Sequence, residues 1–127
     1  KATQQTHNNT GTTLILALNY SGKTEIVSAV KSIAQQCVNG SLDVGNINNK
    51  TIDQNLYTNG IPDPELLIRT SGELRISNFL LWQIAYCELY FTDKLWPDFK
   101  QEDFYQAIYD YQNRERRFGL VSEQINK

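Results

Sequence analysis

The stretch TTLILALNYSGKTEIVSAVKSIAQQC, residues 12–37, decides the predicted fold. Residues 12–18 form a short, almost entirely apolar run, which is typical of a strand buried on both faces of a parallel sheet. Residues 19–22 break this run, and from Lys23 onward the apolar residues recur at helical spacing. A strand, a tight turn and an amphipathic helix make half of a βαβ unit. The stretch therefore predicts an α/β fold.

The rest of the chain continues to alternate between strand and helix patterns. The further predicted elements are strands at 65–69 and 88–92, a short helix at 50–56, a helix at 78–86 and a last helix beginning near residue 103. Asp103 is the expected N-cap of that last helix, because a carboxylate accepts from the free backbone N–H groups. The predicted architecture is a mainly parallel β-sheet flanked by helices, and residues 1–127 are expected to be part of such a domain.

Composition excludes several classes of protein. The chain is 40% hydrophobic and 20% charged, which is typical of a folded globular protein and not of a disordered one. Its net charge of −2 argues against a nucleic-acid coat, which needs a basic face. Any anion-binding site must therefore be local.

The rare residue types exclude further kinds of site. Cys37 and Cys87 are too few for a disulfide scaffold or a zinc site, so we expect buried thiols in a reducing compartment. His7 is the single histidine, which argues against a His-based triad or metal cage. No apolar run reaches the length of a membrane span, and we expect no signal peptide. Because the sequence contains no Met, we expect a piece of a longer polypeptide.

The loop after the predicted strand at 65–69 gathers groups that suit a diphosphate. Arg69 ends the strand, Arg75 and Ser77 follow within one loop, and ligands of parallel α/β sheets bind beyond the carboxyl ends of strands. Each guanidinium can chelate two oxygens, and the amides of 70–72 could add an anion-binding nest. Glu73 would orient the arginines or hold Mg²⁺. On the residues alone, a solvated loop with surface ion pairs stays open as the alternative.

Other candidate features favour ordinary structural roles. The turn at 19–22 could cradle a phosphate at a helix N-terminus, but it lacks the spacing of known phosphate loops and is interpreted as a plain turn. Arg114 to Arg117 is interpreted as a solvated helix end. A set of aromatic side chains is interpreted as core or subunit contact: Phe79, Trp82, Tyr86, Tyr90, Phe91 and Trp96.

Several longer segments resemble one known family. They are DPELLIRTSGELRISNFLLWQ at 63–83, AYCELYF at 85–91, WPDF at 96–99, NRERRFG at 113–119 and LNYSGKTEI at 18–26. Together they resemble the C-terminal half of cis-prenyltransferases of the undecaprenyl diphosphate synthase kind. The resemblance implies an enzyme that condenses isopentenyl diphosphate with a farnesyl-type allylic diphosphate to a long polyprenyl diphosphate, such as the undecaprenyl carrier of cell-wall glycans.

The resemblance also implies roles for individual residues. Arg69, Arg75 and Ser77 match the positions that bind isopentenyl diphosphate, and Glu73 matches an acidic residue of the same site. Glu88 matches the residue linked to Mg²⁺ and to the dimer neighbour.

At the C-terminal end, Arg117 and Gly119 match an Arg-x-Gly motif that reaches the partner's active site. The resemblance further implies a Mg²⁺ cofactor, a homodimer, and a cytoplasmic enzyme that touches the membrane peripherally through its lipid product. The net charge already argues against a nucleic-acid partner.

Departures from the family pattern limit what these residues should do alone. Lys23 stands where Arg is commoner, and the family's early Asp-Gly-Asn-Gly-Arg-Trp segment, which supplies the metal-binding Asp, is absent from the sequence. We therefore expect no prenyl transfer by this chain by itself. A non-catalytic partner subunit of a heteromeric enzyme is the alternative, although the retained Arg69, Arg75, Ser77 and Glu88 argue against it. A generic nucleotide-binding domain fails for lack of a phosphate loop.

Overall fold

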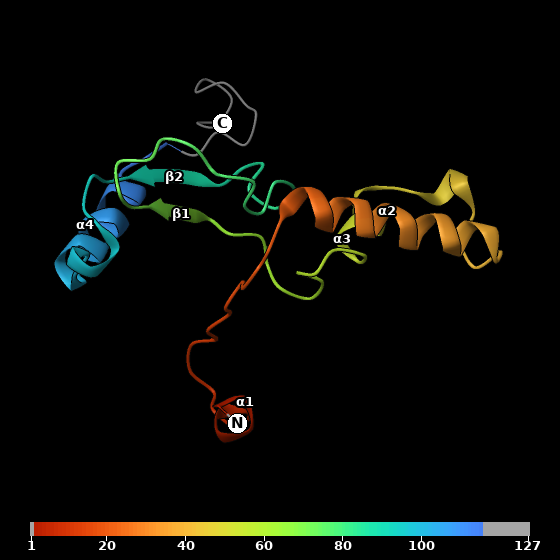
Figure 1. The fold of residues 1–127 in the computed structure, drawn as a ribbon, viewed down its shortest axis with the longest axis horizontal. Helices are drawn as coiled ribbons and strands as arrows, with labels where there is room; N and C mark the ends of the chain where they lie inside the picture. The colour runs from red at the N-terminus through yellow and green to blue at the C-terminus, as the bar shows by residue number, and fades with distance from the viewer. Residues whose placement is uncertain (1, 116–127) are drawn as a thin grey trace, which may run out of the picture.

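The computed structural model describes residues 2–115. Most of its elements fall into two groups, and the short N-terminal helix lies apart from both (Figure 1). One group is a small sheet with the last helix beside it; the other is the long helix with a short one below it. In chain order the elements are α1 (Ala2–Thr6), α2 (Gly22–Val38), the 3₁₀ helix η1 (Val44–Asn46), α3 (Asn49–Asp53), β1 (Leu66–Arg69), β2 (Glu88–Phe91), the 3₁₀ helix η2 (Trp96–Asp98) and α4 (Gln101–Gln112).

The two strands pair in parallel, as expected for an α/β protein. Their register sets Leu66 beside Glu88 and Arg69 beside Phe91. Because parallel strands need a crossover connection, the segment between them brings the chain back to the end of the sheet where β1 began. The predicted strands at 65–69 and 88–92 are confirmed, and so is the α/β class with a parallel sheet.

Helix α2 confirms the amphipathic helix predicted from Lys23 onward. Ser21 is its N-cap and accepts from the backbone N–H of Thr24. The buried face follows the helical period through Gly22, Glu25, Ala29 and Ile33, so the apolar stripe is interrupted by one carboxylate. The short helix predicted at 50–56 is confirmed as α3, which is shorter than expected, and it contacts α2.

Helix α4 is also confirmed, but Asp103 is not its N-cap. The N-cap is Lys100, and Asp103 stands three residues into the helix, where its Oδ2 accepts from the backbone N–H of Lys100 at 2.9 Å. The carboxylate therefore satisfies an N-terminal amide from inside the helix rather than from its cap. Ala107 of this helix is buried, whereas Phe104 is exposed.

Two predicted elements are wrong. Residues 12–18 form no strand; they are extended and exposed, with Leu14 and Leu18 each 82% accessible. The reason is that a strand needs a neighbour for its backbone groups, and the sheet of the described residues pairs β1 with β2. The helix expected at 78–86 is a series of turns, because Asn78 and Leu80 have positive φ angles of 63° and 45°, which a right-handed helix excludes.

The remaining expectations concern burial and membranes. Both cysteines are free thiols, but they are half-buried rather than buried as expected. Within residues 2–115, no helix is long and apolar enough to cross a membrane.

Candidate functional site

Arg69 occupies the position that the sequence predicts for an anion-binding residue. It is the last residue of β1, at the carboxyl end of the parallel pair. Its Nε is buried and has no hydrogen-bond partner among the described residues. Leaving a buried donor without an acceptor costs about 1–3 kcal/mol, and more for a charged group. An anion at the strand end would supply that acceptor, so Arg69 fits a diphosphate oxygen.

Arg75 and Glu73 lie in the loop that follows β1 and pair with each other. The Arg75 Nη1 lies 2.5 Å from the Glu73 Oε2, while the Arg75 side chain is 70% exposed. An exposed pair of this kind contributes little to stability. The contact is compatible with the first role predicted for Glu73, orienting an arginine.

The predicted nest of backbone amides is wrong for two of its three members. The N–H of Ser71 donates to the carbonyl of Lys94 at 2.8 Å, and the N–H of Gly72 donates to that of Thr92 at 3.0 Å. These bonds fasten the loop to the chain that follows β2, so the two amides are not directed at a ligand. Gly72 has φ of +66°, and a Cβ there would lie 3.1 Å from the Asp93 carboxylate, which explains the glycine.

Ser77 stands at the start of a strained turn. Ser77, Asn78 and Leu80 have φ angles of 48°, 63° and 45°, in a region that costs about 1–3 kcal/mol per non-glycine residue. Such conformations persist only where the surroundings hold them, and they cluster at functional sites. The hydroxyl of Ser77, which the sequence assigns to the diphosphate site, is thus placed by a turn that other residues must hold.

The N-terminus of α2 holds that turn. Asn78 accepts from the backbone N–H of Gly22 through its carbonyl and from that of Lys23 through its Oδ1, both at 2.9 Å, and its Nδ2 donates to the Ser21 hydroxyl at 2.8 Å. A Cβ on Gly22 would lie 2.9 Å from the Leu81 Cγ. Since the first amides of α2 are occupied in this way, the interpretation of residues 19–22 as a plain turn holds and a phosphate cradle there is excluded.

Glu25 is a buried charged residue beside this turn that the sequence analysis did not identify. It is fully buried at 0% accessibility in the first turn of α2, and its carboxylate accepts from the Tyr20 hydroxyl, the Tyr57 backbone N–H and the Gln83 amide. An acid in the first helical turn usually serves the helix dipole, which hides its role. The available signal was its spacing, which puts it on the same helix face as Ala29 and Ile33.

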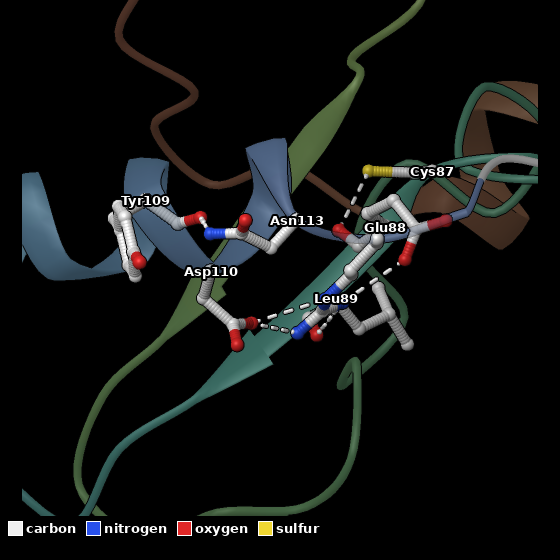
Figure 2. Close-up of polar contacts among 7 residues, drawn as sticks. Cys87, Glu88, Leu89, Tyr109, Asp110 and Asn113 are labelled. Carbon is white, nitrogen blue, oxygen red and sulfur yellow. Dashed lines mark hydrogen bonds and ion pairs between the residues drawn. The ribbon is translucent and has the colours of Figure 1, made fainter.

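Glu88 lies at the other end of the sheet, in a cluster of charges (Figure 2). The register sets it beside Leu66, three residues before Arg69. The Arg114 Nη1 donates to the Glu88 Oε2 at 3.0 Å and to the Leu89 carbonyl at 2.8 Å, and its guanidinium also bonds Asp110. The bond to Glu88 is the main reason that the pKa of Arg114 is raised above its ordinary value.

A known protein family matches almost the whole chain. The model of the family described as "Putative undecaprenyl diphosphate synthase" matches residues 1–119. The chain belongs to the undecaprenyl diphosphate synthase family. The cis-prenyltransferase resemblance drawn from residues 63–83 is thereby confirmed.

Curated members of the family match nearly all of this chain. The isoprenyl transferase of Bacillus subtilis is 56% identical over 121 residues, which are 95% of this chain and 46% of that protein. The farnesyl-diphosphate-specific ditrans,polycis-undecaprenyl-diphosphate synthase of Pasteurella multocida is 56% identical over 97% of this chain and 51% of its own length. The chain spans about half the length of the curated relatives it matches.

Solved structures of the family share the fold. Lavandulyl diphosphate synthase from Lavandula x intermedia, in complex with dimethylallyl diphosphate, superposes with a TM-score of 0.89 at 43% identity, over 93% of this chain and 51% of that one. A probable undecaprenyl diphosphate synthase from Campylobacter jejuni gives a TM-score of 0.67 at 36% identity, over 82% of this chain and 46% of that one. The described residues therefore have a cis-prenyltransferase fold.

The residues present do not by themselves fit the magnesium site implied for the family. Residues 2–115 contain no cluster of three or more acidic, His or Cys side chains that could hold a metal. Glu88 is the predicted ligand, and it faces the Arg114 guanidinium. The predicted Arg-x-Gly residues, Arg117 and Gly119, lie outside the described residues.

Proposed function

We propose that this chain carries the isopentenyl diphosphate grip of a cis-prenyltransferase, an enzyme that condenses isopentenyl diphosphate with an allylic diphosphate. One observation carries the proposal: the Nε of Arg69 is buried at the carboxyl end of β1 and has no hydrogen-bond partner within residues 2–115. Arg75 and Ser77 follow in the adjacent loop, and membership of the family supports the same assignment.

The grip works through charge and hydrogen bonding. A diphosphate at the end of β1 would accept from the Arg69 guanidinium, which is charged at any physiological pH and suits two oxygens at once. The Glu73 carboxylate keeps the exposed Arg75 directed, and the Ser77 hydroxyl donates a further bond. These groups bind and orient the substrate; they form no nucleophile or base, so the chemical step requires groups beyond them.

The proposed product is a long polyprenyl diphosphate such as undecaprenyl diphosphate, the carrier lipid of cell-wall glycans, made from a farnesyl-type starter. Support comes from the Pasteurella multocida relative, which is named as specific for farnesyl diphosphate and is 56% identical. The structure named for lavandulyl diphosphate is more distant at 43% identity. The proposed location is cytoplasmic, with peripheral membrane contact through the lipid product.

Magnesium enters the proposal only as an ion that accompanies the diphosphate. Glu88 is engaged by Arg114, and the described residues assemble no acidic cluster around it. No step of the grip described above depends on the metal.

A homodimer is part of the proposal. Large apolar side chains are exposed on α4 and before it, among them Trp96 at 74% and Tyr109 at 63% accessibility, as an interface would require. Arg117 would then reach the partner's diphosphate site.

Mixing two inactive variants tests the proposed dimer. Both variants are made in a completed protein, in which the N-terminal half of the Bacillus subtilis relative is fused to this chain. An Arg117→Ala variant and an Arg69→Ala variant should recover activity together, because one composite site regains both arginines. No gain after confirmed subunit exchange would contradict the dimer.

A non-catalytic partner subunit is not favoured, because the chain retains the complete set of arginines and serine for the grip.

Steady-state kinetics on the same completed protein tests the function. Arg69→Ala and Arg75→Ala should each weaken the use of isopentenyl diphosphate, because losing a charged bidentate contact costs about 2–4 kcal/mol. The 127-residue chain alone should show no turnover and serves as the blank. Unchanged KM and kcat for isopentenyl diphosphate in both variants would contradict the assignment.

A further inference from the structure

Glu25 is buried, and its hydrogen-bond donors among residues 2–115 are neutral groups. They are the Tyr20 hydroxyl, the Tyr57 N–H at 2.8 Å, and the Gln83 Nε2 at 3.2 and 3.3 Å. Burial, and then the neighbouring Glu25, raise the pKa of the Tyr20 phenol above its ordinary value. A buried acid is costly unless its bonds are complete, so its presence calls for a role.

The arrangement requires a carboxylate rather than any polar side chain of the same size. Three donors from three separate segments converge on Glu25, and an ionised carboxylate only accepts. An amide in its place would direct its own N–H groups at one of these donors. Glu25→Gln therefore keeps the side-chain shape but loses acceptor capacity. This substitution separates the effect of hydrogen bonding from the effect of packing.

One of the three donors to Glu25, the Gln83 amide, belongs to the turn that carries Ser77. Gln83 lies at the far end of that turn, and its Nε2 also donates to the Thr58 hydroxyl at 2.8 Å. At the near end Asn78 is fastened to the first amides of the helix that contains Glu25. Both ends of the strained turn are thus held on one short stretch of α2.

We propose that Glu25 is a positioning residue, which holds the turn of residues 77–83 against α2 and thereby sets the place of the Ser77 hydroxyl in the diphosphate grip. This role rests on the proposed function. Glu25 acts through Gln83 and the turn, and it does not touch the substrate.

Amide hydrogen exchange on the 127-residue chain tests the hold directly, without a ligand. Glu25→Gln should speed exchange of the Gly22 and Lys23 amides, which donate to Asn78, about tenfold or more, the loss expected for one charged hydrogen bond. The double variant Glu25→Gln with Gln83→Glu exchanges the acceptor and donor and should restore part of the protection. Unchanged exchange in Glu25→Gln, or no recovery in the double variant, would overturn the role.

Calorimetric titration with inorganic pyrophosphate tests the consequence for binding. Glu25→Gln should weaken pyrophosphate affinity about tenfold. The matched control is Ile33→Ala, which removes a buried side chain from the same face of α2, two turns further along, and should leave the affinity within about twofold. Equal losses in the two variants would show general destabilisation and overturn positioning. Absence of binding by the unsubstituted chain would instead overturn the proposed function, while the exchange measurement still decides the role of Glu25.

Discussion

Residues 14–18 and strand β1 are apolar runs of the same kind with different outcomes. Leu66, Leu67 and Ile68 pair with β2 and are half-buried. The run at 14–18 stays unpaired, with Leu16 70% exposed beside a pocket of about 460 Å³. An apolar run is therefore suited to a strand, but becomes one only where a neighbouring strand accepts and donates its backbone hydrogen bonds.

The largest effect should come from placing a charge in each run. Leu67→Asp, opposite Leu89 in the sheet, should lower the free energy of unfolding by about 2–4 kcal/mol, because it buries an unpaired carboxylate and removes apolar contact. Leu16→Asp on the exposed run should change it by less than about 0.5 kcal/mol. Urea unfolding followed by far-UV circular dichroism measures both changes. Equal losses of unfolding free energy in the two variants would contradict the different roles of the two runs.

Arg114 and Arg75 differ in their exposure and in their ion-pair partners. Arg114 is 30% exposed and holds α4 to β2 through Glu88 and Asp110, whereas Arg75 is 70% exposed and pairs with Glu73 alone. Arg114→Gln should cost about 1–3 kcal/mol of stability, and Arg75→Gln no more than about 0.5 kcal/mol. The same unfolding experiment decides, and a larger loss for Arg75→Gln would contradict the assignment of Arg114 as the anchor of α4.

The smallest expected effect is on the acid sensitivity of folding, through the Asp103 carboxylate. The backbone N–H of Lys100, and then the Lys94 ammonium, lower the pKa of Asp103 below its ordinary value of 3.8. A lowered folded-state pKa stabilises the protein above the unfolded value, and this contribution is lost as the pH falls through the folded value. Thermal unfolding between pH 2 and pH 6 should therefore be less acid-sensitive in Asp103→Asn. Glu102→Gln in the same turn controls for the lost charge, and identical pH profiles would contradict this.

Much of the fold could be predicted because its signals are local. The strands at 65–69 and 88–92 and the helix after Lys23 follow from apolar spacing alone, and Arg69 ends β1 as the sequence predicts. The failures have non-local causes. The pairing of residues 12–18 depends on a neighbouring strand, and the positive φ angles after Ser77 depend on hydrogen bonds to a helix more than fifty residues earlier.

Two smaller misses follow from the same distinction. Asp103 was placed at the N-cap because a carboxylate can reach the free amides from either the cap or the first turn, and sequence does not separate the two. Glu25 was overlooked because a first-turn acid is ordinarily exposed, and only the fold shows that it faces Gln83.

The most direct test of the diphosphate grip is the NMR signal of the Arg69 Nε–Hε group on titration with isopentenyl diphosphate. This donor is buried and unpartnered in the described structure, so a diphosphate oxygen should become its acceptor. We predict a large, saturable downfield shift of this signal, with inorganic pyrophosphate giving the same shift and Arg69→Lys removing the signal and weakening the binding. An Arg69 signal that stays in place while the ligand saturates elsewhere on the chain would contradict the account.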